Sequence, residues 1–225
     1  MLSYYITDRC QFAGDEAERR RQLLQTIRRA ATAGVDYIQL REKDLAVREL
    51  EAIAREALCV VRNEGTAKLL INHRSDLALA VGADGVHLTG SDLAASEVRA
   101  LRAESSSPSA GFLVAVSCHS AAEVRLAESH GADFAVLAPV FEKVGAETAP
   151  LGLDELRRAA QLDRKPDTRV EAGDAGRAFS VFALGGITLE RAAFCSAAGA
   201  RGIAGIRLFQ QAGDIAALVA KLRSL

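Results

Sequence analysis

Cysteine is scarce in this sequence and follows no paired pattern. The chain has 225 residues and 4 cysteines, none of them in a C-x-x-C pair: Cys10, Cys59, Cys118 and Cys195. Zinc clusters and disulfide frameworks need closely spaced or repeated cysteines, so neither is expected here. Widely spaced, reduced thiols are typical of a cytoplasmic protein.

An excess of charge of one sign is also lacking. The 28 basic and 29 acidic side chains leave a formal net charge of −1, so no overall field favours nucleic acid or an anionic membrane as a partner. No apolar run is long enough to span a bilayer, and the start, MLSYYITDRC, lacks the basic flank and apolar core of a signal peptide. We therefore expect a soluble cytoplasmic protein whose ligands bind at local sites.

The chain does contain a regular alternation of short apolar runs and longer segments of helical period. The helical segments include residues 23–34 and 50–62. The apolar runs predict strands at about Tyr4–Ile6, Tyr37–Arg41, Lys68–Ile71, Gly85–Leu88, Leu113–Ser117, Phe134–Ala138, Ser180–Leu184 and Gly202–Ile206. Strict alternation of strand and helix indicates a parallel sheet with helices outside it.

Two architectures fit that alternation, a closed barrel and an open doubly wound sheet. The open sheet usually has fewer strands, and no G-x-G-x-x-G follows a strand here. A weak repeat over 33–40, 81–88, 130–137 and 198–205 places a glycine before every second strand, where it would end a helix in the left-handed conformation. We therefore predict an α/β fold, a single (β/α)8 TIM barrel over residues 1–225.

One stretch interrupts the pattern. Residues 161–179 are polar, with Pro166 and two glycines, between the sixth helix and the seventh strand. Connections from helix to strand lie on the barrel face opposite the active site. We expect a mobile inserted surface loop with no catalytic role.

Polar side chains gather after the predicted strands, at the face where barrels hold their active sites. After the second strand, Gln39, Arg41 and Lys43 alternate with Leu40 and Glu42. The two-residue period of a strand sends the first three to the same side. A glutamine and two cations at the barrel mouth suit an anion or a phosphate, and a surface ion pair is the alternative.

Other strand ends add further candidates. Three residues are expected to contact a ligand: Asn72, Ser117 and His119. Asp92 follows the fourth strand and is a further candidate for the site. The alternative is that it caps a helix beginning near Leu93, since aspartate is favoured at that position. His87 lies inside an apolar strand, which is typical of a hydrogen-bonded core histidine.

The last two strands end in a pattern that suits phosphate. Gly185 and Gly186 allow the backbone to approach a ligand closely, and a helix starting near Thr188 directs free N–H groups toward it. Barrels often hold phosphate between the loops after strands seven and eight. Ile206 and Arg207 follow the eighth strand, and the arginine can add a charge-assisted contact.

Together these motifs resemble the thiamine phosphate synthase and TenI proteins over nearly the full length of the chain. The matching stretches keep the family's order and spacing: YYITD (4–8), IQLREK (38–43), LLINHRSDLALAVGADGVHL (69–88), VSCHS (116–120), GADFAVLAPVF (131–141), ALGGIT (183–188) and GARGIAGI (199–206).

The resemblance implies roles for individual residues. In the synthases, a thiazole nitrogen is joined to a pyrimidine methylene and pyrophosphate leaves, neutralised by magnesium. Gly186 matches a contact to the thiazole phosphate, and Asp92 matches one of two aspartates that hold the magnesium. The pyrimidine diphosphate side is matched by Gln39, Arg41, Lys43, Asn72 and Ser117.

Several positions depart from the synthase pattern. His73 stands where the synthases have the second magnesium aspartate, and histidine replaces a hard carboxylate ligand poorly. Residues 142–146, EKVGA, lack the threonines of the synthases' phosphate loop, and Arg207 replaces a serine.

The TenI branch departs in a similar way, and its known activity is a metal-free tautomerisation of a carboxythiazole phosphate. By resemblance, His119 is then the acid/base, because histidine titrates near neutrality. Arg41 or Lys43 would hold the substrate carboxylate, and Gly185, Gly186 and Arg207 the phosphate.

Three functions follow from the resemblance. The first is a metal-independent thiazole tautomerase with no cofactor. The second is a thiamine phosphate synthase with an altered magnesium site, which takes a pyrimidine diphosphate as well as a thiazole phosphate. The third is a non-catalytic regulator that only binds such a ligand. The sequence fixes no oligomeric state and is compatible with a homodimer.

Overall fold

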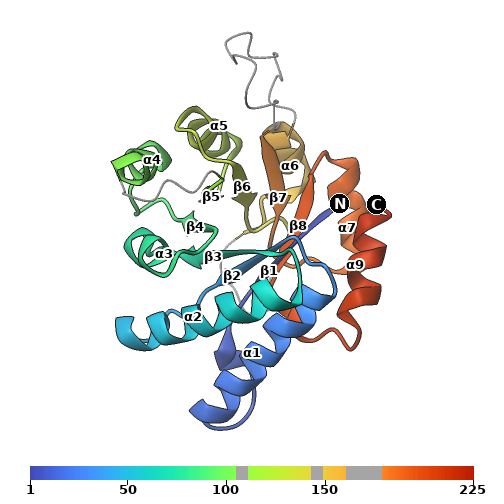
Figure 1. The fold of residues 1–225 in the computed structure, drawn as a ribbon. Coiled ribbons are helices and arrows are strands. Elements are labelled where there is room, and N and C mark those ends of the chain that lie inside the picture. The colour runs from blue at the N-terminus through green and yellow to red at the C-terminus, as the bar shows by residue number, and fades with distance from the viewer. Residues whose placement is uncertain (105–110, 143–148, 161–178) are drawn as a thin grey trace.

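Eight parallel strands close into a barrel in the computed structural model, which describes residues 1–104, 111–142, 149–160 and 179–225 (Figure 1). The strands follow one another around the barrel in chain order: β1 (Leu2–Ile6), β2 (Tyr37–Leu40), β3 (Lys68–Asn72), β4 (Gly85–Leu88), β5 (Leu113–Cys118), β6 (Phe134–Leu137), β7 (Ser180–Ala183) and β8 (Gly202–Gly205). The predicted fold is confirmed, and every predicted strand is present with ends shifted by at most two residues.

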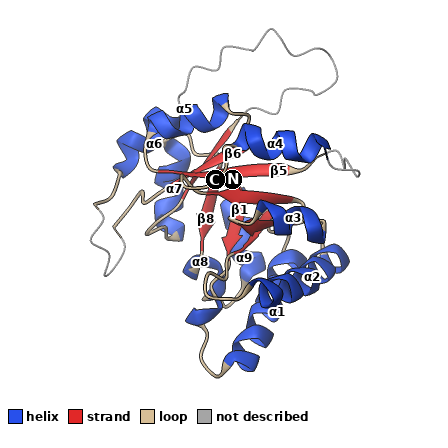
Figure 2. Ribbon diagram, turned by 90° about the vertical axis from the view of Figure 1, so that its left-hand side faces the viewer, coloured by secondary structure: helices blue, strands red, loops and turns tan. Residues whose placement is uncertain are grey.

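Helices cover the outside of this barrel (Figure 2). In chain order they are a short 3₁₀ helix η1 (Arg9–Gln11), then α1 (Glu16–Thr32), α2 (Val47–Glu64), α3 (Ser75–Val81), α4 (Ala95–Glu104), α5 (Ala121–Ser129), α6 (Gly152–Ala160), α7 (Leu189–Ala197), α8 (Arg207–Gln210) and α9 (Ile215–Arg223). The two termini lie side by side, where the Met1 amino group donates to the Leu222 carbonyl at 2.7 Å (Figures 1 and 2). No helix among the described residues is long and apolar enough to cross a membrane.

Strand alternation divides the buried residues into two layers. On β1, Tyr5 packs with the helices, whereas Tyr4 and Ile6 point into the barrel. The same alternation continues on β2, where Tyr37 and Gln39 face inward. Because inward residues near the carboxyl ends of the strands meet at one mouth, this register positions the polar side chains of the site.

Aromatic rings fill the barrel interior below that mouth. Tyr4, Tyr37, Phe134 and Phe182 contact one another with ring centroids 4.9–5.9 Å apart. Gly202 on β8 makes room for this cluster, since a Cβ added there would lie 2.2 Å from Cε1 of Phe182. The interior is therefore a packed core that supports the cavity above it.

Gly202→Ala is expected to destabilise the fold by about 2 kcal/mol, because the added methyl group overpacks the aromatic cluster. Urea unfolding of both proteins measures this change. Gly213→Ala is the matched control, since a Cβ there meets nothing within 4 Å. If both substitutions lowered the free energy of unfolding by the same small amount, the aromatic cluster would be able to accommodate the added methyl group without strain.

The predicted helix-ending glycines are confirmed. Gly34, Gly82, Gly131 and Gly199 have φ of 78°, 70°, 79° and 96°, which is the left-handed region that ends helices. The predicted loop at 161–179 lies outside the described residues except for Phe179. The prediction for that segment therefore stays a prediction.

Candidate active site

A cavity of about 590 Å³ opens at the carboxyl ends of the strands. It is lined by every residue that the sequence suggested for catalysis or substrate binding: Gln39, Arg41, Lys43, Asn72, Ser117, His119, Gly185, Gly186, Ile206 and Arg207. Asp92, the expected metal ligand, does not line it. The ends of five strands, β2, β3, β5, β7 and β8, thus bring the predicted residues together, and their individual roles stay predictions.

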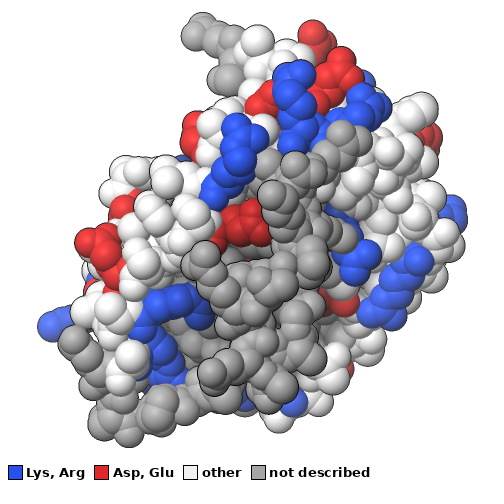
Figure 3. Space-filling view, turned by 90° about the horizontal axis from the view of Figure 1, so that it is seen from above, with Lys and Arg blue, Asp and Glu red and all other residues white. Residues whose placement is uncertain are grey.

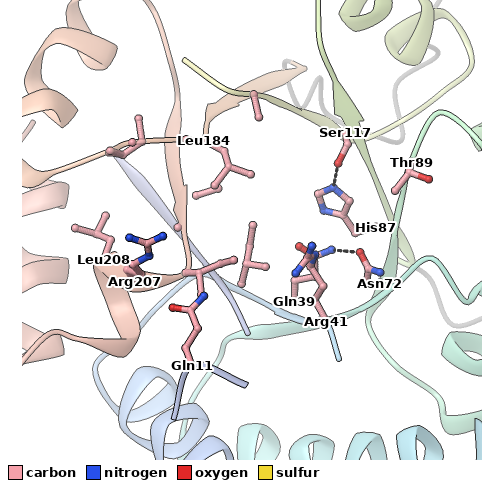
Figure 4. Close-up of a pocket in the computed structure, with 18 of the residues that line it drawn as sticks. Gln11, Gln39, Arg41, Asn72, His87, Thr89, Ser117, Leu184, Arg207 and Leu208 are labelled. Atoms are coloured by element: carbon pink, nitrogen blue, oxygen red, sulfur yellow. Dashed lines mark hydrogen bonds between the residues drawn. The ribbon is translucent and has the colours of Figure 1, made fainter. Parts of the chain in front are cut away.

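The cavity has two unlike sides (Figure 4). Gln39, Asn72, His87 and Ser117 lie on one side, and Arg207 lies opposite them. On the first side, the Gln39 amide nitrogen donates to the Asn72 side-chain oxygen at 2.7 Å. That bond leaves the Asn72 amide nitrogen as a donor and the Gln39 oxygen as an acceptor for a ligand.

A buried ion pair beneath the rim holds the segment that carries the two cations. The side chains of Arg9 and Glu42 are only 3% and 1% exposed, and their charged atoms lie 3.2 Å apart. Thr7 completes the link, because its hydroxyl donates to Glu42 at 2.5 Å and accepts from the Arg41 backbone N–H at 2.9 Å. Burial raises the pKa of the Glu42 carboxyl, while the hydrogen bonds from Thr7 and Arg9 oppose that rise. This network therefore fixes the backbone from which Arg41 and Lys43 reach the cavity.

A chain of hydrogen bonds runs from the barrel core to the cavity wall. The Tyr4 hydroxyl lies 2.8 Å from Nδ1 of His87. On the other side of the ring, Nε2 of His87 lies 2.8 Å from the Ser117 hydroxyl (Figure 4). Burial, together with the smaller effect of the nearby Arg41 charge, lowers the pKa of His87 to about 3, so the imidazole is neutral. The expected core histidine is confirmed, and it also forms part of the cavity floor.

His119 presents one ring nitrogen for chemistry. Its Nδ1 lies 2.7 Å from the Ala138 carbonyl oxygen, which can only accept, so Nδ1 carries a proton. In the neutral ring, Nε2 is then the basic atom. The Ser120 cap of α5 and the contact of the His119 backbone N–H with Glu123 at 2.8 Å hold this residue at the rim.

The glycine turn after β7 forms the opposite side. Gly185 and Gly186 have φ of 99° and 62°, and a Cβ on Gly186 would lie 2.4 Å from the Glu142 carbonyl oxygen. Only glycine fits that turn without displacing the chain after β6. Thr188 caps α7 by accepting from the Arg191 backbone N–H, as its place before the helix suggested.

Arg191 is a cavity residue that the sequence did not reveal. Its guanidinium donates to the Gly186 carbonyl oxygen at 2.7 Å and stacks over the Phe141 ring at 4.8 Å. Its position three residues after the helix cap was the one feature of the sequence that placed it near the glycine turn. Its contact with Phe141 depends on tertiary packing and could not be predicted. Gln11 and Leu208 also line the wall and were not indicated by the sequence.

The residues at the magnesium position that the resemblance implies, Asp92 and His73, do not suit that ion. One oxygen of Asp92 accepts from the Thr89 backbone N–H at 2.6 Å and from the Thr89 hydroxyl at 2.9 Å, and the other contacts the His73 ring. The Asp92 side chain is 5% exposed and is therefore engaged within the protein. Within the described ranges, no group of three or more His, Cys, Asp or Glu side chains is arranged to hold a metal. Magnesium prefers several oxygen ligands in an octahedral arrangement, which this pair does not supply.

Asp92 also does not cap a helix, so that alternative is wrong. Helix α4 begins at Ala95, and the Ala94 backbone N–H is satisfied by Glu97 instead. Asp92 turns back to Thr89 because the intervening residues form a tight turn, closed by the Asp92 N–H to the Thr89 carbonyl at 3.1 Å.

The cavity wall is rich in cations relative to carboxylates. Among the described lining residues, Glu142 is the one carboxylate, against four cationic side chains: Arg41, Lys43, Arg191 and Arg207. On the face seen from above, by contrast, basic and acidic side chains are interspersed among the described residues (Figure 3). The local excess of positive charge therefore suits an anionic small molecule in the cavity.

Comparison with known proteins agrees with this fold and site. A family model described as thiamine monophosphate synthase, TMP-TENI, matches residues 4–209. The "Putative thiamine-phosphate synthase 2" of Aquifex aeolicus is 37% identical over 207 residues, which cover 92% of this chain and 96% of that protein. The "Thiamine-phosphate synthase" of Syntrophomonas wolfei is 33% identical over 224 residues, covering 99% and 94%.

A solved structure points the same way. The thiamine phosphate pyrophosphorylase of Pyrococcus furiosus has a TM-score of 0.75 and 26% identity, and the alignment covers 99% of this chain and 94% of that one. The names of these relatives favour the synthase alternative over the tautomerase expectation. The chain belongs to the thiamine monophosphate synthase (TMP-TENI) family, a family of thiamine-biosynthesis enzymes.

Proposed function

We propose that this protein is a thiamine phosphate synthase, which joins a thiazole phosphate to a pyrimidine diphosphate. The names of its relatives support this reaction. The observation that carries the proposal is one cavity with two unlike sides, an amide and hydroxyl wall from β2–β5 and a glycine and arginine side after β7 and β8. A single-substrate isomerase has less need of both.

The size and charge of the cavity suit two small anions. A volume of about 590 Å³ is within the range of ligand pockets, and the two substrates are each small. Gln39, Asn72 and Ser117 would bind the pyrimidine. The turn at Gly185 and Gly186 would receive the thiazole phosphate, as phosphate sites after strands seven and eight do in other barrels.

The proposed reaction forms one bond and breaks one. The thiazole nitrogen attacks the pyrimidine methylene with its lone pair, the C–N bond forms, and the C–O bond breaks. Pyrophosphate leaves with that electron pair. Arg41 and Lys43 would bind the leaving group and stabilise its developing charge, since fixed cations in a partly dry site act most strongly on such charge. Holding both substrates in one cavity supplies the orientation.

The family implies magnesium for this leaving group, but the Asp92–His73 pair does not fit it. We therefore assign that charge to the arginine and lysine side chains of the wall. No step is routed through a metal ion.

A second candidate function is the metal-free thiazole tautomerase, and His119 favours it. Its Nε2 has no hydrogen-bond partner among the described residues and lies at the cavity rim, where it is suited to take a proton from one atom of a substrate and return it to another. The missing metal carboxylate also agrees with a reaction that needs no metal.

A product assay separates these candidates. The protein is incubated with thiazole phosphate and pyrimidine diphosphate, with magnesium and then with a chelator, and thiamine phosphate is measured. The synthase proposal predicts product in both conditions. If no product forms but a carboxythiazole phosphate tautomer is aromatised, and His119→Ala abolishes that activity, the tautomerase holds. Binding of either ligand without turnover would indicate a regulator.

A further inference from the structure

The hydrogen-bond chain Tyr4–His87–Ser117 has a direction that the buried atoms determine. Tyr4 is 0% exposed, and among the described residues its hydroxyl has one hydrogen-bond partner, Nδ1 of His87. If Nδ1 donated instead, the hydroxyl hydrogen of Tyr4 would be buried without an acceptor. Such orphaned donors are rare and costly, so Tyr4 donates and Nδ1 accepts.

The same donor-to-acceptor order continues from the imidazole of His87 to Ser117 at the cavity. His87 is neutral, because burial lowers its pKa to about 3, and a neutral imidazole carries one proton. With Nδ1 accepting, that proton is on Nε2, which donates to the Ser117 hydroxyl oxygen at 2.8 Å. The hydroxyl hydrogen of Ser117 therefore points away from His87, which makes it available to a ligand in the cavity that Ser117 lines.

We propose that Tyr4 and His87 are positioning residues that fix Ser117 as a hydrogen-bond donor to the ligand. The wall at Ser117 then selects a ligand with an acceptor atom there, such as an unprotonated ring nitrogen or an oxygen. A ligand that presents a donor at the same place meets a second donor and is disfavoured. Tyr4 and His87 stack with ring centroids 5.7 Å apart, which keeps the imidazole in this orientation. The identity of the ligand rests on the proposed function, but the direction of the chain does not.

The first test is the tautomer of His87 in the free protein. Long-range ¹H–¹⁵N correlation spectra of the imidazole distinguish a proton on Nε2 from one on Nδ1. We expect the Nε2–H form for His87 throughout pH 6–8. The Nδ1–H form would overturn the proposal, whether or not the protein makes thiamine phosphate.

The second test is a double-mutant cycle on ligand binding. The probe is the pyrimidine diphosphate, titrated calorimetrically without thiazole phosphate. Tyr4→Phe and Ser117→Ala are each expected to weaken binding about 10-fold, the effect of one hydrogen bond of about 1.4 kcal/mol. Because Tyr4 acts through Ser117, the double variant should bind no more weakly than Ser117→Ala alone. Multiplied losses would contradict the proposal.

Tyr5→Phe is the matched control for this cycle. Tyr5 is the next residue on β1, and among the described residues its buried hydroxyl has no hydrogen-bond partner. Removing it should leave both the binding and the His87 spectrum unchanged. If the pyrimidine diphosphate does not bind the wild-type protein, the proposed function fails while the tautomer still decides the inference. Thermal unfolding of Tyr4→Phe shows that the variant is folded.

Discussion

Arg41→Gln is expected to lower kcat/KM for thiamine phosphate formation about 100-fold, the effect typical of removing one charge-stabilising donor from an active site. Glutamine keeps the polar character of the side chain but removes the positive charge that would meet the pyrophosphate. Initial rates with both substrates, in the presence of chelator, measure the change. Much of the loss should appear in kcat, because the charge on the leaving group develops in the transition state.

Arg55→Gln is the control for this substitution. Arg55 lies on the exposed surface of α2 and pairs with Glu51 one helical turn away, outside the cavity. It should leave kcat/KM within about 2-fold, as surface ion pairs contribute little. A comparable small effect at Arg41 would show that this cation does not act on the leaving group.

The second large effect is expected at the buried ion pair. Arg9→Met should lower the free energy of unfolding by about 4 kcal/mol, because Glu42 is left as a buried charge without its partner. Arg9 also contacts Asp44 at 2.7 Å, so the variant loosens the segment that carries Arg41 and Lys43. Urea unfolding measures the stability at neutral pH.

The double variant Arg9→Met with Glu42→Gln should recover part of that loss, since it removes the unpaired charge.

Lowering the pH should also reduce the loss of stability in the single variant Arg9→Met, because it protonates Glu42. Burial raises the pKa of Glu42, and a carboxyl with a raised folded-state pKa costs stability above that pKa and stops doing so once protonated. The deficit of Arg9→Met relative to wild type should therefore shrink as the pH falls through the folded-state pKa of Glu42. A deficit that is constant with pH would contradict a buried charge as its cause.

Local periodicity predicted much of this site. The alternation of Gln39, Arg41 and Lys43 with apolar or outward residues was enough to place three side chains at the barrel mouth, because the period of a strand is a local property. The glycines of the repeat likewise predicted where helices end, since few other residues adopt the left-handed backbone conformation.

Contacts between segments that are far apart in the sequence could not be predicted from it. Glu42 lies just after β2 and does not line the cavity, yet it pairs with Arg9, 33 positions earlier, because Arg9 at the start of η1 contacts the segment that follows β2. Arg191 reaches the site only because α7 brings it over Phe141. Helix α1 begins at Glu16, well before the segment of helical period at 23–34, because Asp15 caps a first turn whose polar side chains carry no apolar periodicity.

The most direct test of the two-sided cavity is whether two ligands bind at once. Thiazole phosphate is titrated calorimetrically into the protein, with and without saturating inorganic pyrophosphate, in chelator throughout. We expect thiazole phosphate to bind with a dissociation constant changed by less than about 3-fold, because the glycine turn after β7 and the cations Arg41 and Lys43 after β2 would hold the two anions on separate sides of the cavity. Mutually exclusive binding of the two anions would contradict it.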